Sequence, residues 1–264
     1  MKHFRACKEI GDFFSMAKKS KKYEKKNGNE KQQKEDKSMP VQEKAAFDKL
    51  PKDVQEKLKA IKTKLDKFQK QALEKFDKYI AGITLLPPPK PEEQKEQKPE
   101  DKDKINVLVL VDDSDSRKMS KFELKDKLSV IMGNIAQEID KNLVPQTVIL
   151  SELWQNCYDA KYELLQLIAM SAPIFDRGML AAIKIAEVHK TMVLKKFEKY
   201  IISYVLAGSL VQGRATPTSD IDVWIVIDDT DVKKMTRAEL KDKLRAIIIG
   251  MGIEAGDLTG IKNK

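Results

Sequence analysis

The stretch IDVWIVIDDTDVKKMTRAELKDKL (residues 221–244) joins an apolar run, a cluster of acidic residues and a charged segment with helical spacing. A similar stretch, INVLVLVDDSDSRKMSKFELKDKL (105–128), lies 116 positions earlier. Over residues 221–247, 14 of 27 positions are identical at this offset. LKKFEKYI (194–201) likewise echoes LEKFDKYI (73–80). Such self-similarity indicates a duplicated structural unit.

Each copy has the same expected order of elements: helix, variable loop, strand, acidic turn and helix. Apolar residues recur every three or four positions over 50–80, which predicts a long helix with one apolar face. The near-continuous apolar run at 105–111 is typical of a buried strand. Ser120 and Thr236 are each followed three residues later by a glutamate, so a capping box marks the start of each second helix. The aspartates at 112–113 and 228–229 are interpreted as turn or cap residues.

The two copies end differently. Copy one continues into a predicted second strand (145–153) and helical segments near 158–171 and 177–201, whereas copy two stops, in the same register, before such a strand. We therefore expect an α+β protein built from tandem units, each a mixed sheet flanked by helices. The expected divisions are a basic tail (1–45), a first unit (46–175) with an exposed proline-rich loop (86–104), and a second unit (176–264) that is truncated at its C-terminal end.

Charge is distributed unevenly along the chain. The net charge is +9; residues 1–104 hold 28 Lys/Arg against 19 Asp/Glu, and residues 105–264 hold 22 against 22. The basic, weakly apolar tail is predicted to be disordered. Such a tail can also approach nucleic acid or another polyanion through long-range attraction.

The chain has no run of 18 apolar residues and no apolar signal segment near its start, so we predict a cytoplasmic protein with no membrane partner. The sequence leaves open whether the chain starts at Met1 or at Met16. Cys7 and Cys157 are far apart and are expected to be reduced thiols. Because His3 and His189 are the only histidines, carboxylates remain as the plausible catalytic groups.

The segment GSLVQGRATPTSDID (208–222) distinguishes the two copies. Asp220 and Asp222 correspond to Lys104 and Asn106 in copy one, which also lacks the Gly-Ser turn. The absence of both the turn and the acids from copy one indicates that the two features act together. Residues two apart on a strand project from one face, and paired carboxylates there suit Mg²⁺ or Mn²⁺.

The turn itself has the composition of a phosphate site. Gly208 brings no side-chain bulk, and Ser209 begins an expected helical turn whose backbone N–H groups can receive a phosphate. Arg214 adds a positive charge to the same loop. Together, the turn and the acids are suited to a metal-bound triphosphate.

This pattern resembles the Gly-Ser, Gly, Ser-Asp-x-Asp signature of the nucleotidyltransferase superfamily typified by DNA polymerase β, and is most similar to its minimal archaeal and bacterial members. The resemblance implies that Gly208 and Ser209, with Ser219, bind the nucleotide, that Gly213 permits a tight turn, and that Asp220 and Asp222 hold two Mg²⁺ ions. It also implies transfer of a nucleoside monophosphate from a nucleoside triphosphate to a hydroxyl acceptor, with release of pyrophosphate. Copy one is then a degenerate nucleotidyltransferase-like unit.

One departure from the family pattern leaves alternatives open. The family adds a third carboxylate from a later strand, and copy two ends before such a strand; Glu152 of copy one is a conceivable substitute. The alternatives are a non-catalytic nucleic-acid- or ribosome-binding module on a decayed nucleotidyltransferase fold, or one piece of a split gene. The open edge of copy two also makes a second copy or a partner chain a candidate for completing the sheet.

Overall fold

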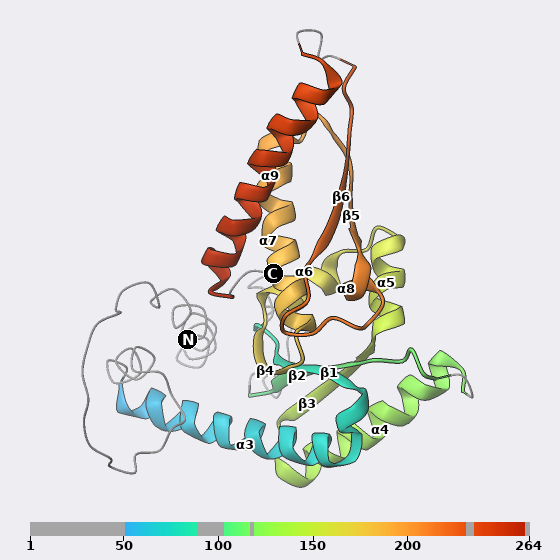
Figure 1. The fold of residues 1–264 in the computed structure, drawn as a ribbon. Coiled ribbons are helices and arrows are strands. Elements are labelled where there is room, and N and C mark those ends of the chain that lie inside the picture. Colours follow the sequence, from blue (N-terminus) through green and yellow to red (C-terminus); the bar gives the residue numbers. More distant parts are fainter. Residues whose placement is uncertain (1–50, 89–102, 117–118, 231–234, 262–264) are drawn as a thin grey trace, which may run out of the picture.

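The computed structural model describes residues 51–88, 103–116, 119–230 and 235–261. The predicted tail (1–45) and most of the proline-rich loop lie outside these residues. The described chain alternates helices and strands (Figure 1). In order, the elements are α3 (Lys52–Phe76), the 3-10 turn η1 (Asp77–Tyr79), β1 (Ile80–Leu85), β2 (Ile105–Val111), α4 (Lys121–Ile139), β3 (Leu143–Ile149), α5 (Leu150–Tyr158), α6 (Glu163–Met170), β4 (Ala172–Asp176), α7 (Met179–Phe197), β5 (Ile201–Ala207), α8 (Gly208–Val211), β6 (Asp222–Ile227) and α9 (Arg237–Thr259).

Four strands form a mixed sheet in the order β3-β2-β1-β4. β1 pairs antiparallel with both β2 and β4, and β3 runs parallel to β2. The parallel connection from β2 to β3 runs through α4, as a crossover requires. The expected α+β class with a mixed, helix-flanked sheet is confirmed for this part of the chain.

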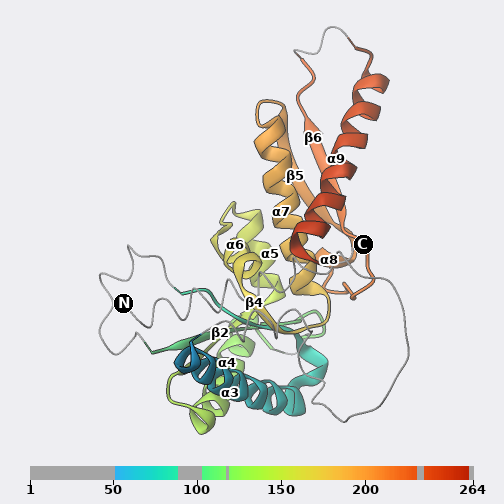
Figure 2. The ribbon, with the colours of Figure 1, turned by 90° about the vertical axis from the view of Figure 1, so that its left-hand side faces the viewer.

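Helices cover both faces of this sheet. Alternate β2 residues, Val107, Val109 and Val111, pack with α3 and α4 in one core. Leu108 and Leu110 point the other way and pack with residues of α5, α6 and α7 in a second core. Figure 2 shows α3 and α4 on one side of the sheet and α5, α6 and α7 on the other. Burial on both faces explains why the sequence of β2 is apolar at nearly every position.

The last third of the chain forms a hairpin. β5 and β6 pair antiparallel, and α7 and α9 pack against each other beside them. This hairpin and the two helices extend away from the four-stranded sheet (Figure 1). Leu210 of α8 reaches back into the second core and is almost fully buried. One core therefore joins residues from both sides of the predicted 175/176 division.

The two hairpins pair in the same register. Ile80 lies opposite Val111, and Ile201 lies opposite Ile227. An irregularity follows each pair, and the next four pairs also correspond at offsets of 121 and 116 positions. The two hairpins are thus similar in strand pairing as well as in amino-acid sequence. That both are nucleotidyltransferase-like units stays a prediction.

Helix capping follows the sequence closely. Ser120 Oγ accepts the backbone N–H of Glu123 at the start of α4. Thr236 and Glu239 form the full reciprocal capping box at the start of α9. Hydrogen bonds from Thr236 also hold the pKa of Glu239 below its usual value. Both predicted helix starts are confirmed.

Other boundaries differ from expectation. The predicted strand 145–153 ends at Ile149, so Glu152 lies in the first turn of α5 rather than on a strand. β4 was not expected, and it interrupts the apolar region between α6 and α7. Tyr158 of α5 is 87% exposed. No helix within the described ranges is long and apolar enough to span a membrane.

Candidate functional site

The hairpin register brings the Gly-Ser turn and the acids together. Asp222, the first residue of β6, lies opposite Ala207, the last residue of β5. Because the turn begins at the next residue, Gly208, the carboxylate of Asp222 lies beside it. The two ends of the segment 208–222 thus meet at one end of the hairpin.

Gly208 and Asp222 are in close contact. Gly208 has a φ of +69°, a left-handed conformation that favours glycine. A Cβ atom built on Gly208 would fall 1.9 Å from Asp222 Oδ2 and 2.9 Å from its Cγ. Any side chain at position 208 would therefore displace the carboxylate. The glycine is needed both for its backbone conformation and for the space that the acid occupies.

Asp220 lies two residues before Asp222, just ahead of β6. Both aspartates are exposed, whereas Ile221 between them is half-buried and packs against the second core. This alternation of inward and outward residues continues along β6. The two carboxylates accordingly share the solvent side of the chain while Ile221 anchors the segment.

Hydrogen bonds within the loop hold the segment that precedes the acids. Ser219 Oγ accepts the backbone N–H of Thr216 at 2.8 Å, and Ser219 N–H donates to the carbonyl of Thr216 at 3.1 Å. The loop also presses on Gly178, where an added Cβ would fall 2.5 Å from the Thr216 carbonyl carbon. Ser219 therefore has a structural role in this turn.

Gly213 also has a left-handed conformation, with a φ of +72°. A Cβ there would lie 3.1 Å from Leu150 Cδ1 and 3.3 Å from Asp112 Oδ1. The tight turn predicted at Gly213 is present, and it rests against the first half of the chain. Asp112, expected only as a turn residue, is thus a carboxylate beside this loop.

The remaining predicted residues lie around the same turn. Ser209 is half-buried in α8, and its carbonyl accepts the backbone N–H of Arg214 at 2.9 Å. The exposed Arg214 guanidinium donates to the side-chain oxygen of Gln212. The first N–H groups of a helix have no intrahelical acceptors, and α8 begins at Gly208.

Glu152 is held elsewhere. Its Oε1 accepts a hydrogen bond from Lys125 Nζ of α4 at 2.7 Å, and its Oε2 is buried without a partner. Among the described residues, no three histidine, cysteine or acidic side chains cluster as a metal site. The pair of acids at the turn is therefore the candidate ligand set, without a third carboxylate grouped with it.

His189 belongs to the packing that supports the hairpin. Its Nε2 donates to the carbonyl of Ile248 on α9 at 3.0 Å, and its Nδ1 accepts from the hydroxyl of Tyr204 on β5 at 2.8 Å. Burial lowers the pKa of His189 and raises that of Tyr204. The neutral imidazole ties α7 to both neighbouring elements, as expected for a core residue and not a ligand.

Comparison with known protein families gives a match over this hairpin. Residues 188–250 match the model of the nucleotidyltransferase domain, a stretch from within α7 to within α9 that includes every predicted site residue. The match supports membership of this segment in the nucleotidyltransferase superfamily, so the resemblance read from the sequence is confirmed. No curated protein and no solved structure matched the chain.

The structure brings Gly208, Ser209, Gly213 and Asp222 to one turn, with Asp220 on the adjoining segment. Sequence reasoning missed Gly178, which receives the loop, and Asp112, which borders it. Asp176 accepts the backbone N–H groups of Gly178, Leu180 and Ala181, and so holds this end of α7. The N-cap of α7 is Gly178 itself, and nothing in the sequence shows what packs on that glycine.

Proposed function

We propose that the chain is a divalent-metal-dependent nucleotidyltransferase, which moves a nucleoside monophosphate from a nucleoside triphosphate to a hydroxyl acceptor and releases pyrophosphate. The observation that carries the proposal is the carboxylate of Asp222 held against the left-handed Gly208 at the start of α8. The family match over the same residues supports the reaction class.

The donor set fits Mg²⁺ or Mn²⁺ carrying a nucleotide. Mg²⁺ is commonly held by one or two carboxylates together with substrate phosphates and water, and Asp220 and Asp222 are two exposed carboxylates on neighbouring outward positions. When bound, the metal would stabilise the charge that develops on the phosphates. The two acids would thus bind the metal and, through it, position the triphosphate.

The chain's other residues are assigned to binding and orientation. The backbone of Gly208 and Ser209 would receive the phosphates, since α8 begins there and the first N–H groups of a helix have no intrahelical acceptors. Arg214 would add a positive contact from the loop. Gly213 and Ser219 shape that loop through the left-handed turn and the Thr216 hydrogen bonds, so we assign them indirect roles in nucleotide binding.

Transfer assays with labelled nucleoside triphosphates, Mg²⁺ and a panel of RNA, protein and small-molecule acceptors test the proposal. Labelling that depends on Asp222 supports it. Equal labelling by the wild type and by Asp222→Ala would remove the catalytic role. Metal-dependent nucleotide binding without transfer to any acceptor would instead favour a non-catalytic binding module.

A further inference from the structure

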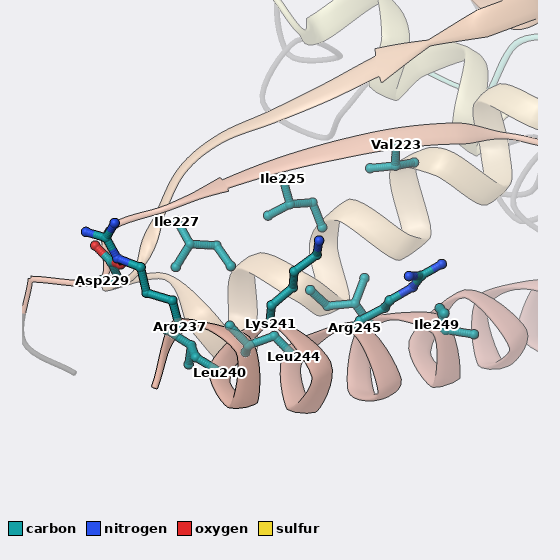
Figure 3. A pocket seen from close by; sticks show the side chains of 11 residues that line it. Val223, Ile225, Ile227, Asp229, Arg237, Leu240, Lys241, Leu244, Arg245 and Ile249 are labelled. Carbon is teal, nitrogen blue, oxygen red and sulfur yellow. The ribbon is translucent and has the colours of Figure 1, made fainter. Parts of the chain in front are cut away.

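An open groove runs between β6 and α9 (Figure 3). Its floor is apolar, and three basic side chains of α9 stand along it. The apolar lining comes from Val223, Ile225 and Ile227 on the strand and Leu240, Leu244, Ile248 and Ile249 on the helix; the basic residues are Arg237, Lys241 and Arg245. This surface combines a strand edge with an incompletely covered apolar layer.

The first half of the chain shows what fills the corresponding space. At the offset of 116 positions, Val107, Val109 and Val111 of β2 correspond to the three apolar strand residues of the groove. These valines are at most 2% exposed, whereas Val223, Ile225 and Ile227 are only half-buried. β3 pairs with the edge of β2 that faces away from β1, and it adds Leu143 and Ile149 to the same core. In the part of the chain that the structure describes, β6 pairs with β5 alone.

Two polar contacts fix the end of β3 in the first half. Lys125 donates to Glu152 at 2.7 Å, and Asp113 accepts both the backbone N–H and the hydroxyl of Ser151. The corresponding residues of the second half are Lys241 and Asp229. Both line the groove. The groove therefore has the same three features that hold β3, Ser151 and Glu152 in the first half. These features are an apolar floor, a lysine that can pair with a carboxylate, and an aspartate that can accept from a hydroxyl residue.

We infer that this groove binds an extended segment of another polypeptide, which adds to β6 as a parallel strand. The segment should carry apolar residues at alternate positions, and just past its end a hydroxyl residue followed by a carboxylate. The hydroxyl and its backbone N–H pair with Asp229, and the carboxylate pairs with Lys241. Strand addition to an open sheet edge is a common mode of peptide recognition.

Charge favours this occupant, because Arg237, Lys241 and Arg245 present three positive charges to the single acid of the groove, Asp229. Arg237 already pairs with Asp229 at 3.1 Å. Among the described residues, Lys241 has no ion-pair partner. A second copy of this chain is a poorer occupant, since its own matching segment, β3, is already paired in its sheet. The inference does not depend on the proposed nucleotidyl transfer.

A peptide of this chain's residues 143–153, LVPQTVILSEL, is a direct probe. Titrated into the full chain, it should change the fluorescence of Trp224, which lies on β6 and is 70% exposed. Lys241→Glu should weaken binding about tenfold, because an attractive pair becomes a repulsive one. A peptide with lysine at the glutamate position should regain affinity for Lys241→Glu. Lys243→Glu, an exposed lysine of α9 outside the groove, is the matched control.

Orientation and occupant are tested with the same protein. A photoreactive residue at the Ile149 position of the peptide should crosslink near Ile227 and not near Val223, because the segment runs parallel to β6. No binding, or binding unchanged by Lys241→Glu, overturns the inference. Self-association that Lys241→Glu abolishes, without peptide binding, would also overturn it in favour of a second copy as the occupant.

Discussion

Asp222 and Gly208 are in close contact, because a Cβ atom added to Gly208 would lie 1.9 Å from Asp222 Oδ2. The register of the β5–β6 hairpin creates this contact, since Asp222 is opposite Ala207, the residue before the glycine. A side chain at position 208 would therefore be incompatible with the present position of the Asp222 carboxylate.

Gly208→Ala should therefore impair both stability and nucleotide binding. A non-glycine residue in the left-handed region costs about 1–3 kcal/mol, and the exposed Asp222 carboxylate would have to move away from the added Cβ. We expect a lower thermal midpoint by circular dichroism and loss of metal-dependent nucleotide binding. Gly250→Ala is the matched control, because an added Cβ there meets nothing within 4 Å and should stabilise α9 by about 0.5–1 kcal/mol. An unaffected Gly208→Ala would contradict the observed contact.

Asp222→Asn separates charge from shape. The amide keeps the volume beside Gly208 but removes a negative charge, so Mg²⁺-dependent nucleotide binding should fall at least about tenfold. Folding stability should be unchanged or slightly higher, because repulsion between Asp220 and Asp222 is relieved. Calorimetric titration with and without Mg²⁺ measures the first effect, and thermal unfolding measures the second.

Asp242→Asn removes an exposed acid of α9 that lies outside the turn and provides the control for overall charge. A loss of nucleotide binding as large as that of Asp222→Asn would show that net charge, and not the two acids at the turn, sets the affinity.

Apolar patterning predicted the strands well where both faces are covered. β2 is apolar throughout because each face meets a helical layer. β6 has a similar apolar run, yet Trp224 is 70% and Val226 48% exposed. A local sequence reports what a strand is able to bury, whereas the covering layer is supplied from elsewhere in the chain. Only the structure reveals that the second hairpin lacks it among the described residues.

β4 escaped prediction for a different reason. Its proline, Pro173, argues against a strand, because proline cannot donate to a ladder. Among the described residues, β4 lies at the edge of the sheet and pairs with β1 alone, and a proline is tolerated at such an edge. Likewise, the turn and acids were recognisable as motifs, but their contact depends on hairpin register across a 14-residue loop that no local pattern fixes.

His189 should make folding sensitive to mild acid. Burial lowers its pKa below the usual 6.5, so the unfolded chain binds this proton more readily than the folded one. Stability from the neutral imidazole is therefore complete above pH 6.5 and declines as the pH falls through that value. Thermal midpoints measured from pH 7.5 to 5 should decrease. In His189→Gln, whose amide can still donate to Ile248, this decrease should be smaller; an identical pH profile would exclude His189 as its source.

Gly178→Ala tests whether α7 positions the acids through the loop. Gly178 has a φ of +113°, and an added Cβ would fall 2.5 Å from the Thr216 carbonyl carbon and 2.6 Å from the Pro217 nitrogen. Backbone atoms cannot yield as a flexible side chain would, so the loop of residues 216–219 must shift. We expect a loss of about 1–3 kcal/mol of stability, faster proteolysis within this loop, and weaker metal-dependent nucleotide binding.

The matched control for Gly178→Ala is Gly133→Ala in α4, where an added Cβ meets nothing within 4 Å and the extra methyl should favour the helix. The loop leads directly into Asp220, so moving it should disturb the acids even though Gly178 touches neither. Loss of stability with unchanged nucleotide affinity would mean that the loop follows the acids instead of placing them, and the positioning role would then pass to the β5–β6 register alone.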